Sequence, residues 1–175
     1  MRAGNSEASR KAATAFYDSG RRRLAVIGSN TGTPAIVERE SAFLSAAETL
    51  GASVTLARGG DSDYDGGVTA GRALLAEKTK PDAIFCANDQ IASGLMDVLR
   101  LEAQLRVPED VAVIGFDDVP ESAWLSYQLT TFRQDPLMMA QRAVALLERR
   151  LENPDSPPAY ERVIPELVIR QSFRP

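Results

Sequence analysis

The sequence predicts an α/β fold in which a parallel β-sheet is flanked by helices on both faces. Continuous apolar runs at 24–28, 83–87 and 111–116 have the composition of strands buried on both sides. A fourth run at 52–57 contains β-branched residues, which favour strands. Segments with helical spacing of apolar residues lie between these runs. Such regular alternation is typical of parallel strands joined by right-handed crossovers.

Residues that start and stop helices set the bounds of the helices in this part of the chain. Gly20 and Gly51 are placed as C-terminal caps, because glycine readily adopts the left-handed conformation found there. Pro81 interrupts the chain before the strand at 83–87, and Asp89 is expected to cap the helix that follows it. The predicted helices are 6–18, 35–50, 65–78 and 89–102.

After Asp118 the regular alternation stops. Residues 119–128 are predicted to be irregular, and 129–134 form a short strand candidate. Asp135-Pro136 is a strong helix start, with a capping aspartate and a proline at the first helical position. This helix is expected to run to about residue 151. A Pro-rich connection at 153–158 then leads into one or two strands within 163–169.

The composition restricts the functions that are open to the chain. It has no histidine and one cysteine, Cys86, which excludes an internal disulfide, a Cys/His zinc site and histidine-based catalysis. We expect Cys86 to be a buried thiol. A formal net charge of −4 argues against a large nucleic-acid surface. No cofactor is expected. No apolar run is long enough to span a membrane, and the lack of a signal peptide favours the cytoplasm.

Polar side chains follow three of the predicted strands. Ser29, Asn88 and Asp117 come directly after apolar runs. In open parallel sheets, ligands bind beyond the carboxyl ends of the strands. Carboxylates and amides at these points suit a small polyhydroxyl molecule, and Arg39 could offer it a charge-assisted pair of donors. The same residue types are also common as turn formers and helix caps, so both interpretations stay open.

Three segments, taken in order, point to a protein family. PDAIFCANDQIASGLMDVLR (81–100), VPEDVAVIGFDDVP (107–120) and LTTFRQD (129–135) closely resemble the effector domains of LacI/GalR-type transcription regulators. RESAF at 39–43 is similar to the family's Arg-x-x-Gly-Phe, with Ala42 in the place of glycine. The resemblance covers essentially the whole chain.

The resemblance implies a truncated form of an architecture with two periplasmic-binding-protein-like lobes and an effector between them. Residues 1–130 would be the C-terminal lobe. Residues 131–156 would be a crossover strand and helix belonging to the N-terminal lobe, and 157–175 would return to the C-terminal lobe. The family's DNA-binding headpiece has no counterpart in this sequence. Operator DNA would therefore be bound only through that missing part.

The resemblance also implies roles for individual residues. Arg39, Asn88 and Asp117 match effector-contacting positions, and Thr33 and Ala35 match variable positions that select the ligand. A homodimer is expected, with Trp124 and the helix at 89–102 lying where family members form their dimer interface. Core packing is the alternative for Trp124. The interface residues expected on this basis are Ile91, Leu95, Leu99 and Trp124.

The function implied is that of a ligand-sensing domain of a LacI-type regulator. It would bind a small, sugar-like effector and couple it to operator binding, without being an enzyme. The alternative is a sugar-binding protein of a transport system with the same fold. An enzyme that uses Asp117 and Asp118 with magnesium is a further alternative, but the sequence has no phosphate-cradling loop to support it.

Overall fold

The computed structural model describes residues 2–157 and 159–175 and confirms the predicted α/β class. Its main sheet has six strands in the order β3-β2-β4-β5-β6-β8. The neighbours from β3 to β6 are parallel, and β8 alone runs antiparallel, beside β6. The strands are β2 (Arg23–Gly28), β3 (Ser53–Arg58), β4 (Ala83–Cys86), β5 (Ala112–Asp117), β6 (Thr130–Arg133) and β8 (Glu166–Val168).

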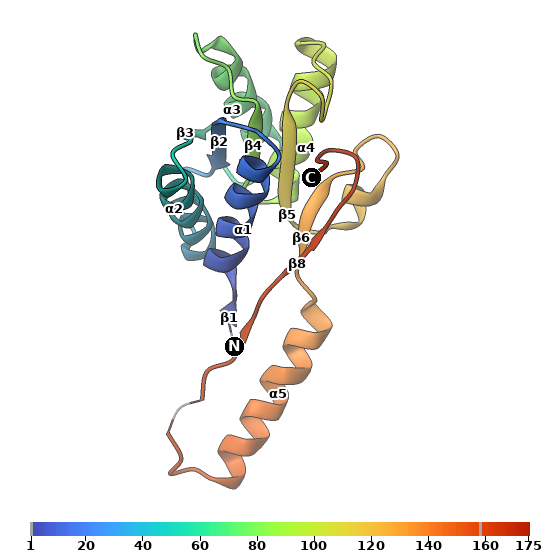
Figure 1. Cartoon of the computed structure of the whole chain (residues 1–175). Coiled ribbons are helices and arrows are strands. Elements are labelled where there is room, and N and C mark those ends of the chain that lie inside the picture. Colours follow the sequence, from blue (N-terminus) through green and yellow to red (C-terminus); the bar gives the residue numbers. More distant parts are fainter. Residues whose placement is uncertain (1, 158) are drawn as a thin grey trace.

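Helices cover both faces of this sheet (Figure 1). Helices α1 and α2 pack together on one face, and α3 packs with α4 on the other. The helix predicted at 89–102 changes character after Asp97, where a π-helical turn, η1 (Val98–Glu102), follows α4. The helices are α1 (Asn5–Asp18), α2 (Pro34–Thr49), α3 (Tyr64–Ala76), α4 (Asp89–Asp97) and α5 (Pro136–Glu152).

The period-two alternation of a strand divides the core into two clusters. In β2, Leu24 and Val26 point into the cluster beneath α1 and α2, whereas Ala25 and Ile27 point into the cluster beneath α3 and α4. Cys86 lies in the second cluster and is fully buried, as the sequence predicts. Because helices cover the central strands of the sheet on both faces, the sequences of these strands are continuously apolar.

The contact between α3 and α4 depends on glycine. A Cβ added at Gly94 would lie 2.1 Å from the carbonyl oxygen of Tyr64, and one added at Gly67 would lie 2.2 Å from that of Ile91. Both neighbouring atoms belong to backbone and cannot move aside cheaply. The two helices therefore approach each other more closely than a side chain at either position would permit.

Helix α5 projects away from the body of the molecule (Figure 1). No side chain of this fully described helix is buried, and Leu137, Val144, Leu147 and Leu151 are among the exposed apolar residues of the chain. The chain returns through β7 (Arg162–Val163), which pairs in parallel with β1 (Arg2–Ala3).

One part of the predicted division into lobes is wrong. Residues 131–133 were assigned to the crossover, but they belong to β6, which pairs in parallel with β5 inside the main sheet. Thr131 and Phe132 are both buried there. The chain leaves the body only after Arg133, where β6 ends. Helix α5 then begins after Asp135, which caps it by accepting a hydrogen bond from the backbone N–H of Met138.

Candidate functional site

Arg39 and Asp117 form the centre of a polar cluster at the carboxyl ends of the parallel strands. Arg39 lies on α2 and is only 5% exposed, and Asp117 is the last residue of β5. Their side chains form an ion pair, with Arg39 Nη1 3.3 Å from Asp117 Oδ1. The structure thus brings together two residues that are 78 positions apart in the sequence and that we expected to face one ligand.

Several contacts fix the guanidinium of Arg39 in place. Nη1 donates to the backbone oxygen of Ala87 over 2.7 Å, and Nε donates to Asn5 Oδ1 over 2.9 Å. The guanidinium carbon lies 3.6 Å from the centre of the Phe116 ring, a cation–π geometry. Burial lowers the pKa of Arg39, and the charge of Asp117 opposes that shift. An arginine side chain nevertheless stays protonated in proteins, so the site keeps a fixed positive charge.

Asp117 is held in an unusual backbone conformation. Its φ is 117°, which L-residues rarely adopt, and the next residue, Asp118, is also left-handed at 59°. Gln134, just after β6, donates from Nε2 to Asp117 Oδ1 over 2.6 Å. The Asp117 side chain remains about a third exposed, so it can accept hydrogen bonds from a ligand. Burial raises the pKa of its carboxyl group, against the effect of Arg39.

Asn88 has a structural role that the sequence analysis gave to its neighbour. Asn88 Oδ1 accepts from the backbone N–H of Ile91 over 2.9 Å, so Asn88 is the N-cap of α4. Its amide nitrogen donates to the backbone oxygen of Ser62 over 2.8 Å and thereby ties down the loop before α3. The expectation that Asp89 caps this helix is therefore wrong, because Asp89 already lies inside the helix with its side chain turned toward the core. Whether Asn88 also contacts a ligand stays a prediction.

The loop after β2 lies at the same edge of the sheet. Ser29 Oγ lies 2.7 Å from Thr31 Oγ1, and the backbone N–H of Asn30 donates to the oxygen of Gly60 over 2.8 Å. Thr33 is exposed as the residue before α2, and Ala35 is half-buried in its first turn. Their role in selecting a ligand stays a prediction.

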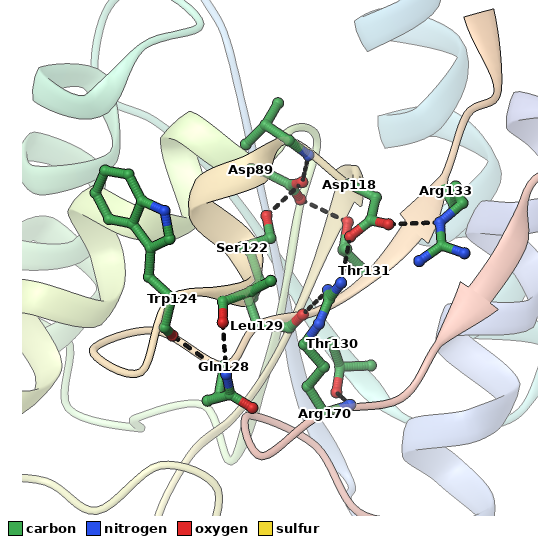
Figure 2. A network of polar contacts seen from close by, with 12 residues as sticks. Asp89, Asp118, Ser122, Trp124, Gln128, Leu129, Thr130, Thr131, Arg133 and Arg170 are labelled. Carbon is green, nitrogen blue, oxygen red and sulfur yellow. Dashed lines mark hydrogen bonds and ion pairs between the residues drawn. The ribbon is translucent and has the colours of Figure 1, made fainter. Parts of the chain in front are cut away.

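Asp118 belongs to a different network from Asp117. Its Oδ2 accepts from Arg133 over 2.6 Å, and its Oδ1 lies 2.7 Å from the guanidinium of Arg170 (Figure 2). Asp118 thereby connects the end of β5 with β6 and with the C-terminal segment. The two adjacent carboxylates therefore do not act as a pair. Within residues 2–157 and 159–175, no three histidine, cysteine, aspartate or glutamate side chains gather as a metal site requires.

Three of the residues expected at a dimer interface have no surface to offer. Ile91, Leu95 and Leu99 are each 0% exposed and belong to the core cluster beneath α3 and α4. The prediction was wrong for them because their four-residue spacing marks the face of the helix that packs on the sheet. Trp124 is 55% exposed and remains available to a partner, so its role stays a prediction.

The fold and this cluster are typical of α/β domains that bind ligands at the carboxyl ends of the strands. The periplasmic binding protein-like domain model matches residues 13–173, and the chain belongs to that family. Within the family it resembles the effector-binding part of LacI-type regulators. It is 31% identical over 161 residues to an HTH-type transcriptional repressor PurR of Pasteurella multocida, covering 91% of this chain and 48% of that protein. The chain thus spans about half the length of the curated relatives it matches.

Solved structures give the same result. A LacI family transcriptional regulator from Arthrobacter sp. FB24 in complex with lactose matches 97% of this chain and 64% of its own, at 30% identity and a TM-score of 0.83. A LacI family regulator from Enterococcus faecalis with bound ribose matches 99% of this chain and 62% of its own, at 26% identity and a TM-score of 0.82.

Proposed function

We propose that this chain is the effector-sensing part of a LacI-type transcription regulator and binds a neutral polyhydroxyl molecule, such as a sugar, at Arg39 and Asp117. The observation that carries the proposal is the buried Arg39, which is fixed by Asn5 and Ala87 and aligned with a carboxylate that is still partly exposed. Such a pair presents donors and an acceptor side by side. Adjacent hydroxyl groups of one ligand can satisfy both.

The charge balance of the site favours a neutral ligand over a phosphorylated one. Arg39 is paired with Asp117, and Arg58, at the end of β3, is paired with the buried Glu40. A phosphate would bring two negative charges to a site whose nearby arginines are already neutralised, and it would face Asp117 directly. A sugar hydroxyl brings no charge and can donate to the same carboxylate.

The relatives support the regulatory role. One is a transcriptional repressor by name, and two structural neighbours were solved with ribose or lactose. We propose that ligand binding here shifts a conformational equilibrium in the longer protein and so changes its affinity for operator DNA. The chain would thus act as a sensor and not as an enzyme. It would work in the cytoplasm, where operator DNA lies, as a dimer that uses the surface around Trp124.

Thermal unfolding of this chain against a panel of compounds tests the proposal. The panel holds ribose, lactose and other neutral sugars, with sugar phosphates and purines as comparisons. A ligand at 100 times its Kd adds about 2.7 kcal/mol to the free energy of unfolding, and this raises the midpoint by roughly 5–10 °C for a chain of this size. A neutral sugar should produce this shift.

Two variants make the result specific. Asp117→Asn should abolish the shift, because the amide donates where the ligand also donates. Asp110→Asn is the matched control, since Asp110 pairs with Arg106 at an exposed turn and should leave the shift intact. A sugar phosphate that stabilises the chain more than any neutral sugar would contradict the ligand class. Equal stabilisation of parent and Asp117→Asn would contradict the site.

A further inference from the structure

Asp89 is a buried carboxylate that the effector site does not use directly. It follows Asn88 in the first turn of α4 and is 0% exposed. Its Oδ1 accepts from Thr131 Oγ1 over 2.6 Å, and its Oδ2 accepts from Ser122 Oγ over 2.8 Å and from the backbone N–H of Val119 over 3.0 Å. Asp89 thus joins α4, β6 and the segment after β5 (Figure 2).

The space around Asp89 is shaped for a carboxylate. A Cβ added at Gly115, in the middle of β5, would lie 2.3 Å from Asp89 Oδ1. Only glycine therefore allows the carboxyl group to pass beside the strand and reach Thr131. The contact is built from residues that lie 26 and 42 positions away from Asp89 in the sequence, so it depends on the folded sheet.

Two of the three donors lie on one short stretch of chain, residues 117–124. This 117–124 segment begins at Asp117 in the effector site and ends at Trp124 on the surface. Between them, the backbone of Ser122 also accepts from the N–H of Leu129 over 2.8 Å. Asp89 is the side chain that holds the middle of the segment, while one end lies at the candidate effector site and the other at the surface.

We propose that Asp89 is a positioning residue that makes the 117–124 segment move as one unit, so that a change at Asp117 reaches the surface around Trp124. The sensing role of Asp117 rests on the proposed function, whereas the link between Asp89 and Trp124 does not. A carboxylate is suited to this task, because a single group with two oxygens can accept all three hydrogen bonds at once.

The coupling between Asp89 and the 117–124 segment can be tested without a ligand, by changing the protonation state of Asp89 with pH. Burial raises the pKa of Asp89 to about 6, the hydrogen bonds from Thr131 and Ser122 oppose the rise, and the negative charge of Asp117 adds to it. The charge of Asp89 in turn raises the pKa of Arg39, on α2, and of the thiol of Cys86, on β4. A protonated carboxyl group donates from one oxygen, so one of the three contacts must reverse or lengthen. The hydroxyls of Thr131 and Ser122 can reverse, but the backbone N–H of Val119 can only donate, so a proton on Oδ2 disturbs the contacts with the 117–124 segment.

The fluorescence of Trp124 reports the position of the segment, because it is the only tryptophan in the chain. The chain also has no histidine, the side chain that ordinarily titrates near neutral pH. We expect the Trp124 emission to change in a one-proton transition with a midpoint near pH 6 while the far-UV circular dichroism stays constant. An emission that is flat from pH 5 to 7.5 in the folded chain overturns the proposal.

Three variants assign the transition. Asp89→Asn should remove it. Asp117→Asn should move its midpoint to lower pH, because the negative charge that adds to the effect of burial on the pKa of Asp89 is gone. Asp97→Asn is the matched control. This carboxylate, also on α4, accepts from Tyr64 and Tyr127, and its variant should keep the transition. A transition that persists in Asp89→Asn, or that Asp117→Asn leaves unmoved, overturns the link.

If Asp89→Asn fails to fold, Ser122→Ala provides the same test, since it removes one donor from the segment and leaves the carboxylate in place. It should reduce the amplitude of the Trp124 transition, and an unchanged amplitude overturns the proposal. The pH experiments use no effector. A chain that binds none of the sugars would contradict the proposed function while leaving the coupling between Asp89, Asp117 and Trp124 to be judged by its own result.

Discussion

The Arg39–Asp117 ion pair is the feature whose energetics can be worked from the structure. Two unit charges 3.3 Å apart attract by about 5 kcal/mol at an effective dielectric constant near 20. Solvent reaches about a third of the Asp117 side chain, which weakens this attraction. We expect a coupling energy of about 1–2 kcal/mol in a double-mutant cycle of Arg39→Met and Asp117→Asn, within the range known for residues in contact.

The single variants should differ strongly in their effect. Arg39→Met removes the donors to Ala87 and Asn5 and the contact with the Phe116 ring, and it leaves Asp117 without its cation. We expect Arg39→Met to lose about 3 kcal/mol in the free energy of unfolding. The loss is not larger because the variant no longer has to bury a charged guanidinium. Asp117→Asn should cost less, about 1 kcal/mol, because its side chain is partly solvated.

Urea unfolding followed by far-UV circular dichroism measures all four corners of the cycle, provided that the slopes with denaturant agree. A loss below about 1 kcal/mol for Arg39→Met, or a coupling below about 0.3 kcal/mol, would refute the reasoning. Either result would mean that the buried guanidinium is held by packing alone and that the carboxylate is not its electrostatic partner.

Three further predictions follow from other parts of the structure. Between pH 3.8 and the raised pKa of Asp89 of about 6, Asp89 binds a proton in the folded state that it does not bind in the unfolded state. Stability should therefore rise by about 1.3 kcal/mol from pH 7.5 to pH 5, as measured by urea unfolding, and Asp89→Asn should lose most of this slope. Gly94→Ala should cost more than about 3 kcal/mol, because its Cβ would meet the backbone of Tyr64; an ordinary loss near 1 kcal/mol would show that α3 and α4 can separate. Gln134→Ala should weaken binding of a stabilising sugar about tenfold by freeing Asp117, with little change in unfolding, and calorimetric titration measures that affinity.

The sequence was sufficient for the parts of the site that depend on strand order. Asp117 and Asn88 follow apolar runs, and the carboxyl ends of parallel strands meet at one edge, so their proximity could be predicted. The contacts that orient the side chains of the site could not be predicted from the sequence. Gln134 and Asn5 lie far away in the sequence, and neither stands in a pattern that marks it as a partner of Asp117 or Arg39.

The adjacent residues Asn88 and Asp89 show the limit of local patterns. Both can cap a helix, and the sequence alone favoured the second. The structure assigns the cap to Asn88, because the carboxylate of Asp89 finds Ser122 and Thr131 across the sheet. A similar limit applied to Ile91, Leu95 and Leu99, whose periodicity marks a buried face but does not say whether the sheet or a second molecule covers it.

Contacts within the chain itself hold the residues of the candidate site in place. Arg39 is held by Asn5 on α1, by Ala87 just after β4 and by Phe116 in β5. Gln134 holds Asp117 in a left-handed conformation that would be costly without such support. A ligand spends little binding energy on arranging groups that the chain holds by its own contacts. A ligand that reaches Arg39 and Asp117 can therefore use its remaining contacts to move the rest of the protein, which is what a sensor of the proposed kind requires.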